Sequence, residues 1–248
     1  MREALLYLLP ISAAEIITIT LGPMWGIASH ILLLVTVTLH AALFDRDQNV
    51  QRLLLSLAII PLIRIISLSI PLVDIPQVWW YPIIYVPLLL ATMQVTRILG
   101  YRFGQIGLNF RRWRFQLLVA LSGLVIGMVE YFILSGEAEA TSLVLGKTWL
   151  LSAFMLLVYT GFVEEFIFRG VLQRSAGDVF GSWRGIVYVS FLFAIVHVIH
   201  YSVLDIIFVF VVAVFFGWVV KKTGSLLGVT LSHGLANIAL FLVVPYLF

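Results

Sequence analysis

The sequence contains no cysteine and very little charge. Of its 248 residues, 11% are Asp, Glu, Lys or Arg, and 62% are hydrophobic. The absence of cysteine excludes disulfides, a thiolate nucleophile, and zinc or iron–sulfur centres bound by cysteine. Soluble domains have roughly 25% charged and 45–50% apolar residues, so this composition predicts an integral, multi-pass membrane protein.

The small excess of basic residues has a simple explanation in such a protein. The formal net charge is +3, and Lys and Arg in short loops set the orientation of membrane helices. We therefore predict membrane lipid as a partner and no nucleic acid. The chain also lacks a repeat of useful length and low-complexity tracts.

Nine hydrophobic runs follow one another with short connections, and a membrane-spanning helix needs about 20 apolar residues. They predict an all-α fold, a polytopic membrane helical bundle of eight or nine transmembrane helices. Glu15 interrupts the first run, which we expect to be a retained segment rather than a cleaved leader; whether it crosses the membrane stays open. The runs are 4–21, 25–44, 53–72, 78–97, 115–134, 148–172, 185–200, 204–220 and 226–247.

Charged residues in the loops predict a topology. With nine spans, every strongly basic loop falls on one side, which the positive-inside rule assigns to the cytoplasm. The basic loops contain Arg46 and Arg52, then Arg97, Arg102, Arg111, Arg112 and Arg114, then Arg174 and Arg184, then Lys221 and Lys222. The alternate loops contain Asp74, then Glu137, Glu139 and Lys147, then Asp205.

One loop, 101–115, combines arginines with aromatic residues. We interpret it as an interfacial connector that meets anionic lipid. A role in holding an anionic substrate is the alternative.

Three charges stand together in the sixth run: Glu164, Glu165 and Arg169. A charge near the bilayer centre costs roughly 2.5–3.5 kcal/mol, so three require a reason. On a helix, Glu165 and Arg169 share one face and can form an ion pair, while Glu164 points about 100° away. The pair would leave Glu164 free to activate water, or the cluster would only lock two helices together.

Two later runs carry further polar side chains. His197 follows Phe193 by one helical turn, and His233 and Asn237 are four residues apart beside Gly234. Each taken alone suits a structural role, either a hydrogen-bonded core histidine or a polar contact between helices. We expect His200 to lie at the membrane interface.

The depth of these residues favours a shared site. Counted from the predicted cytoplasmic ends at about 1.5 Å per residue, Glu164 lies roughly 13–15 Å deep, His197 roughly 18–20 Å and His233 roughly 12–15 Å. Unrelated core residues have no reason to coincide in this way. We therefore predict one site in the cytoplasmic half of the membrane.

The pattern resembles the CPBP family, the CAAX prenyl protease and bacteriocin-processing (Abi-type) intramembrane endopeptidases. The resemblance rests on Glu164-Glu165-x-x-x-Arg169, Phe193-x-x-x-His197 and His233-x-x-x-Asn237, in the order typical of the family. It extends from about residue 145 to the end. We assign residues 115–248 to the catalytic helical core and 1–114 to N-terminal transmembrane helices that match the family poorly.

The resemblance implies hydrolysis of peptide bonds at or within the membrane, in CAAX-type C-terminal processing or in peptide or leader maturation. It implies that Glu164 and His197 hold and activate water and that His233 and Asn237 stabilise the oxyanion. Glu165, Arg169 and Phe193 would support the site. A protein or peptide substrate, with or without an attached lipid, is the implied partner.

Three questions stay open at this point. Glu164, His197 and His233 would also suit a zinc ion, but the His-Glu-x-x-His spacing is absent, and we favour a mechanism without a metal cofactor. A non-catalytic immunity or scaffold factor that binds a peptide or partner helix is the alternative function. A transporter is favoured less, because the polar residues all lie in the second half and do not form two repeats.

Overall fold

The computed structural model describes residues 5–43, 47–70, 75–134 and 149–247, and the described part is helical. Eight helices are long and apolar enough to cross a membrane. They are Pro23–Leu43, Gln48–Ser69, Trp80–Ile98, Trp113–Leu134, Trp149–Phe180, Ser182–His200, Val203–Thr223 and Leu227–Tyr246. The predicted helical membrane bundle is confirmed.

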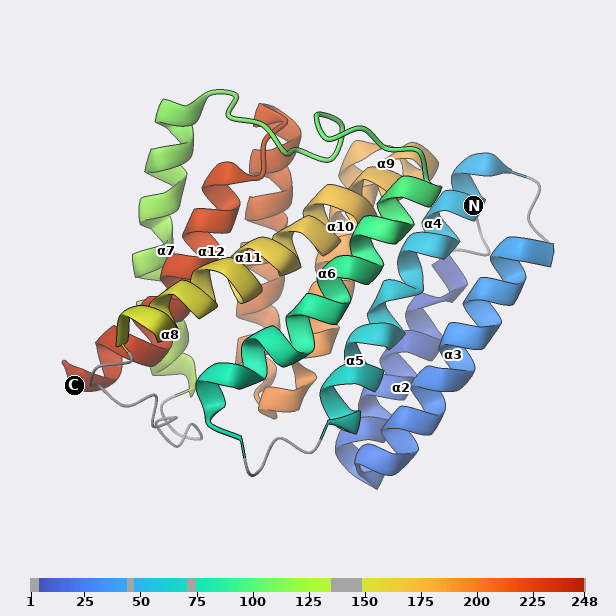
Figure 1. Ribbon diagram of the computed structural model, residues 1–248, viewed down its shortest axis with the longest axis horizontal. Coiled ribbons are helices and arrows are strands. Elements are labelled where there is room, and N and C mark those ends of the chain that lie inside the picture. Colours follow the sequence, from blue (N-terminus) through green and yellow to red (C-terminus); the bar gives the residue numbers. More distant parts are fainter. Residues whose placement is uncertain (1–4, 44–46, 71–74, 135–148, 248) are drawn as a thin grey trace.

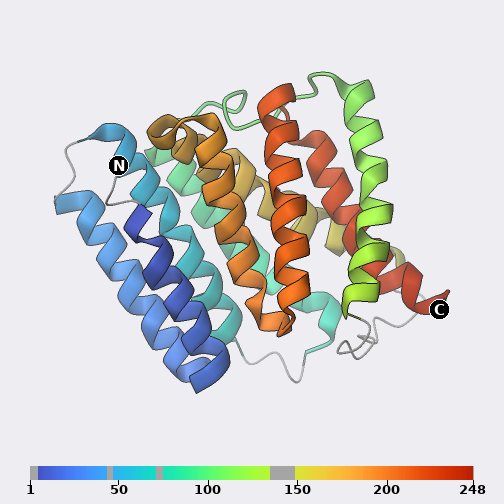
Figure 2. The same ribbon diagram turned by 180° about the vertical axis from the view of Figure 1, so that it is seen from behind.

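The first run forms the shorter apolar helix α2 (Leu8–Leu21), which turns at Gly22 into α3 (Pro23–Leu43). The third hydrophobic run lies in α4 (Gln48–Leu57), which continues as α5 (Ile59–Ser69). These four helices lie side by side at one flank of the molecule (Figures 1 and 2).

The opposite flank is formed by α7 (Trp113–Leu134) and α12 (Leu227–Ile238), which pack against each other. Between the flanks lie α6 (Trp80–Ile98), α10 (Ser182–Ile195) and α11 (Val203–Thr223) (Figures 1 and 2). Short 3-10 segments precede α6, follow α10 and end the chain: η1 (Gln77–Trp79), η4 (Val196–His200) and η6 (Val244–Tyr246).

One helix of 32 residues, Trp149–Phe180, crosses the middle of the bundle (Figure 1). It consists of α8 (Trp149–Met155), two π-helical segments, η2 (Leu156–Glu164) and η3 (Phe166–Leu172), and α9 (Gln173–Phe180). A third π-helical segment, η5 (Ala239–Val243), continues α12. The central helix extends eight residues beyond the predicted run 148–172 because it continues as the amphipathic α9.

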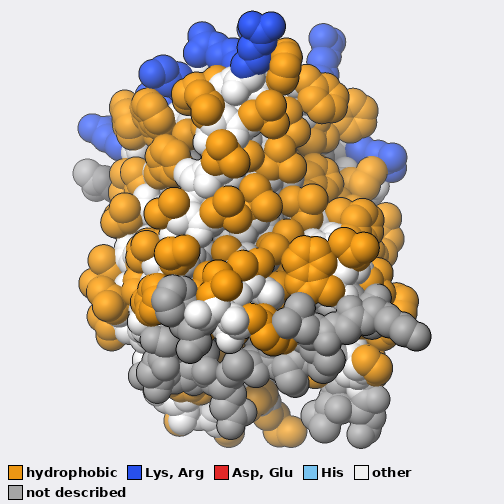
Figure 3. Space-filling model, turned by 90° about the vertical axis from the view of Figure 1, so that its left-hand side faces the viewer, with side chains coloured by type: hydrophobic (Ala, Val, Ile, Leu, Met, Phe, Trp, Pro, Cys, Tyr) orange, Lys and Arg blue, Asp and Glu red, His pale blue; other side chains and the backbone are white. Residues whose placement is uncertain are grey.

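Basic side chains gather at one end of the molecule, and hydrophobic side chains cover the face below them (Figure 3). That the basic loops share one side of a membrane stays a prediction. The loop residues Arg46, Asp74, Glu137, Glu139 and Lys147 lie outside the described residues.

Candidate active site

The two carboxylates of the central helix lie at an irregularity. Glu164 ends η2, and Glu165 lies between η2 and η3. A π-helix forms i→i+5 hydrogen bonds and holds more residues per turn than an α-helix, and such segments are frequent at functional sites. Successive side chains therefore point in more similar directions, which turns both carboxylates toward α12.

Two glycines bring this helix close to α12. A Cβ atom on Gly161 would lie 2.8 Å from the carbonyl oxygen of Thr230 and 2.9 Å from the backbone nitrogen of Gly234. Gly161 and Gly234, neither of which has a side chain, therefore allow the two helices to approach closely. The result is that His233 lies within reach of both glutamates.

His233 contacts both carboxylates through different ring nitrogens. Its Nδ1 is 2.9 Å from Oε1 of Glu165, and its Nε2 is 3.8 Å from Oε2 of Glu164. The same Glu165 oxygen accepts a hydrogen bond of 2.9 Å from Nη1 of Arg169, so the predicted ion pair is confirmed. Glu165 thus holds His233 as well as Arg169, a contact that the sequence did not indicate.

Phe193 connects Arg169 to the histidines. Its ring lies under the Arg169 guanidinium at 4.2 Å and is 4.7 Å from the His197 ring and 6.0 Å from the His233 ring. Because a carbonyl oxygen only accepts, Nδ1 of His197 donates to the Phe193 carbonyl at 2.7 Å. In the neutral ring this leaves Nε2 with a free lone pair.

Asn237 is held from the central helix. Its Nδ2 donates to the hydroxyl of Thr160 at 2.8 Å, and that hydroxyl itself donates to the carbonyl of Leu156. One amide hydrogen of Asn237 is therefore fixed on Thr160, and the second is available to another acceptor.

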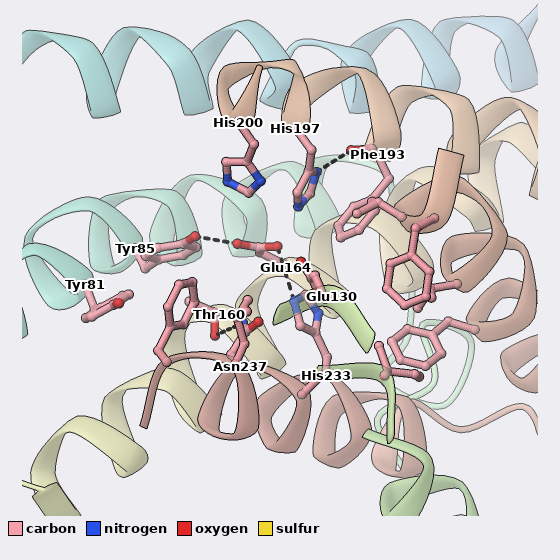
Figure 4. A pocket seen from close by; sticks show the side chains of 18 residues that line it. Tyr81, Tyr85, Glu130, Thr160, Glu164, Phe193, His197, His200, His233 and Asn237 are labelled. Atoms are coloured by element: carbon pink, nitrogen blue, oxygen red, sulfur yellow. Dashed lines mark hydrogen bonds and ion pairs between the residues drawn. The ribbon is translucent and has the colours of Figure 1, made fainter. Parts of the chain in front are cut away.

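These side chains surround one cavity of about 230 Å³ (Figure 4). It brings together the four residues expected to be catalytic, Glu164, His197, His233 and Asn237, together with Phe193. Glu165 and Arg169 are buried behind it, with side chains 0% and 1% exposed. His200, which we expected at the interface, also lines this cavity, and its Nδ1 donates a hydrogen bond of 2.9 Å to Oδ2 of Asp205.

Two residues of the first half act on this site, and the sequence analysis missed both. The hydroxyl of Tyr85, on α6, donates to Oε1 of Glu164 (Figure 4). Arg64, on α5, binds both oxygens of the buried Glu15 at 2.9 and 2.8 Å and donates to the carbonyl of Val196, next to His197. A second cavity, of about 220 Å³, lies between Arg64, Tyr85, Glu164 and His197.

Glu130 of α7 is a third missed residue, since it lines the same cavity of about 230 Å³ as Glu164. A signal was present for Glu130 and Arg64, because each interrupts a hydrophobic run. Tyr85 had no such signal, since a tyrosine in an aromatic-rich span is ordinary.

A zinc site was the open alternative. Within the described ranges, no group of three or more His, Asp or Glu side chains is arranged to hold a metal ion. Both ring nitrogens of His233 face carboxylates, and Nδ1 of His197 is bound to the Phe193 carbonyl. Of the two histidines, His197 therefore has the free imidazole nitrogen, Nε2.

Comparison with known proteins gives a family match over part of the chain. Residues 146–239 match the family described as type II CAAX prenyl endopeptidase, Rce1-like. No curated protein and no solved structure matches the chain. The match covers the central helix and the segments that carry His197, His233 and Asn237, and it supports an integral membrane protease with a protein or peptide substrate. Over residues 146–239, this chain is therefore similar to the Rce1-like type II CAAX prenyl endopeptidases.

Proposed function

We propose that this protein is an intramembrane endopeptidase in which Glu164 activates water. The observation that carries the proposal is the single cavity shared by Glu164, His197, His233 and Asn237 among membrane-spanning helices. Carboxylate, imidazole and amide groups around one enclosed space are the types needed to activate water and stabilise an oxyanion.

The first step is attack on the peptide carbonyl. Water lies between Glu164 and the free Nε2 of His197, and Glu164 takes its proton as the water oxygen bonds to the carbonyl carbon. The carbonyl oxygen becomes an oxyanion that faces His233 and Asn237. Donors aimed at such an oxyanion each contribute roughly 2.7–4 kcal/mol in a low-dielectric site.

His233 can donate to the oxyanion in only one protonation state. Its Nδ1 already donates to Glu165, so Nε2 donates only when the ring carries both protons. The carboxylates of Glu164 and Glu165 on either side stabilise that positive ring. Arg169 in turn holds Glu165 in place.

The second step is collapse of the tetrahedral intermediate. The proton taken from water passes to the amide nitrogen, directly from Glu164 or through His197, as the carbon–nitrogen bond breaks. The products are a carboxylic acid and an amine, so atoms and charges balance without a cofactor. Metal independence stays a prediction: activity should survive a chelator, and a loss restored by zinc would contradict it.

The substrate class we propose is a peptide near the C-terminus of a lipid-modified protein, because CAAX processing is the activity of the matched family. The alternative within the same chemistry is maturation of an unmodified leader peptide. We also propose that the basic end, and with it the nearer half of the membrane, is cytoplasmic.

The test compares the wild type with Glu164→Gln, purified and reconstituted in lipid nanodiscs. Mass spectrometry follows the cleavage of membrane-protein peptides with and without a prenylated C-terminal cysteine. We expect Glu164→Gln to lose roughly 10²–10⁴-fold in rate while the thermal unfolding midpoint is retained. Asp178→Asn, which removes an exposed carboxylate, is the control and should cleave like the wild type. A wild type that cleaves nothing, or a Glu164→Gln variant that keeps its turnover, would indicate a non-catalytic peptide-binding protein.

A further inference from the structure

A third cavity lies at the basic end of the molecule, apart from the active site. Its volume is about 340 Å³, and its walls come from four segments: the connector before α7, the central helix through η3 and α9, the start of α10, and the end of α11. The charged residues that line it are Arg111, Arg169, Arg174, Asp178 and Lys221. Four cations and one carboxylate give this cavity a positive field.

Arg169 is the buried member of this set. Its side chain is 1% exposed, whereas the Arg174 side chain is 44% exposed. Nη1 of Arg169 binds Glu165, but Nη2 has no hydrogen-bond partner among the residues that the structure describes. Oε2 of Glu165 is also buried without a partner in the same ion pair, and the Arg169 guanidinium lies on the Phe193 ring. Arg169 therefore contributes positive charge at the base of this cavity, and the exposed cations contribute the donors.

Two exposed cations at the rim also lack acidic partners. Arg174 forms an ion pair of 3.4 Å with Asp178, but Arg111 and Lys221 form none within the described ranges. Lys221 is held over the ring of Trp183 at 4.5 Å, which fixes its position at the rim. The segment 104–107 contributes little side-chain volume to the cavity wall, because it includes Gly104 and Gly107.

We propose that this cavity binds a phosphate group, with Arg169 at its base and Arg111 and Lys221 at its rim. Phosphate carries several acceptor oxygens that point in different directions, and guanidinium groups bind it with charge-assisted hydrogen bonds. The acceptor sites of a planar carboxylate lie in one plane, whereas phosphate oxygens point in several directions and match cations placed around the cavity better. The phosphate belongs to the headgroup of an anionic lipid or to a free phosphate, since both share this chemistry.

The test measures binding and needs no protease activity. The full-length protein in detergent is titrated with inorganic phosphate and, separately, with short-chain phosphatidylglycerol, and the heat of binding gives Kd. The test variant is Arg111→Gln with Lys221→Gln. The matched control is Arg97→Gln with Arg184→Gln, which removes two exposed cations that do not line this cavity.

We expect saturable binding by the wild type and at least about tenfold weaker binding by the test variant, because a charge-assisted hydrogen bond contributes roughly 1.5–3 kcal/mol. The control should bind within about twofold of the wild type. Binding of inorganic phosphate identifies a free phosphate as ligand, and binding of phosphatidylglycerol alone identifies a headgroup; both support the site. Absence of saturable binding by either probe, or equal weakening in the control, overturns the proposal.

Discussion

Thr160 offers a sensitive test of how the oxyanion is stabilised. Its hydroxyl accepts a hydrogen bond of 2.8 Å from Nδ2 of Asn237, and it lies on the helix that carries Glu164. Thr160→Val keeps the branched shape but removes this acceptor. The Asn237 amide would then be free to rotate and would no longer present its second hydrogen to the oxyanion.

The size of the effect follows from the bond that is lost. A neutral hydrogen bond contributes about 0.5–1.5 kcal/mol, and 1.4 kcal/mol corresponds to a tenfold change. We therefore expect kcat of Thr160→Val to fall roughly 2- to 13-fold. KM should change little, because an interaction made only in the transition state affects kcat.

Thr92→Val is the matched control. Thr92 is also buried, with 0% of it exposed against 7% of Thr160. The hydroxyl of each donates to the carbonyl four residues earlier, but Asn237 donates to Thr160 and not to Thr92. Cleavage of a fluorogenic peptide in nanodiscs measures all variants, and Thr92→Val should match the wild type in kcat.

A double-mutant cycle with Asn237→Ala completes the assay. If Thr160 acts through Asn237, then Thr160→Val should have no further effect on kcat once Asn237 is removed. Additive losses from the two substitutions, or equal kcat values for Thr160→Val and Thr92→Val, would refute this reasoning.

Three further changes test the supports of the site by peptide cleavage and thermal unfolding. Tyr85→Phe removes a charge-assisted hydrogen bond to Glu164 and should lower kcat/KM roughly 10- to 150-fold, whereas Tyr81→Phe, one turn earlier in the same cavity, should not. Arg64→Met leaves Glu15 buried without the guanidinium and should cost about 3–5 kcal/mol of stability. Adding Glu15→Gln should restore stability but not activity, because the hydrogen bond from Arg64 to the Val196 carbonyl is still missing. A full return of activity would contradict a role for that hydrogen bond. Gly161→Ala forces a Cβ to 2.8 Å from the Thr230 carbonyl and should cost about 1–3 kcal/mol, whereas Gly177→Ala meets nothing within 4 Å and should be tolerated.

Hydropathy alone predicted most of the fold. Each hydrophobic run became a helix whose ends lie within a few residues of the expected ones, because a bilayer accepts few alternatives to a helix. The largest difference is at α9, where the central helix leaves the apolar run and continues with polar residues such as Gln173 and Arg174. Periodicity could not predict that extension, since burial against α4 and α10 stabilises it.

The motifs and their depth predicted that these side chains would meet, and they do share one cavity; their catalytic roles stay a prediction. The contacts between them were not predicted. Sequence spacing placed Glu165 with Arg169 and left Glu164 on another face. The π-helical backbone turns both glutamates toward His233, and such a change in helix type depends on packing against α12 rather than on local sequence. Tyr85 and Arg64 lie too far from the motifs along the chain for spacing to connect them.

The helices of the first half complete the physical environment of the catalytic groups. A carboxylate within the membrane is stable only where it has donors, and for Glu164 one donor is Tyr85 of α6. The 3-10 segment with His197 is fixed in turn through Val196 by Arg64 of α5, whose charge is balanced by Glu15 of α2. The family match begins at residue 146, yet the position of its glutamate and of its first histidine depends on three helices that precede it. Substitutions far outside the matched segment should therefore change the catalytic rate without altering any motif residue. The site depends on residues from both expected parts of the chain, 1–114 and 115–248.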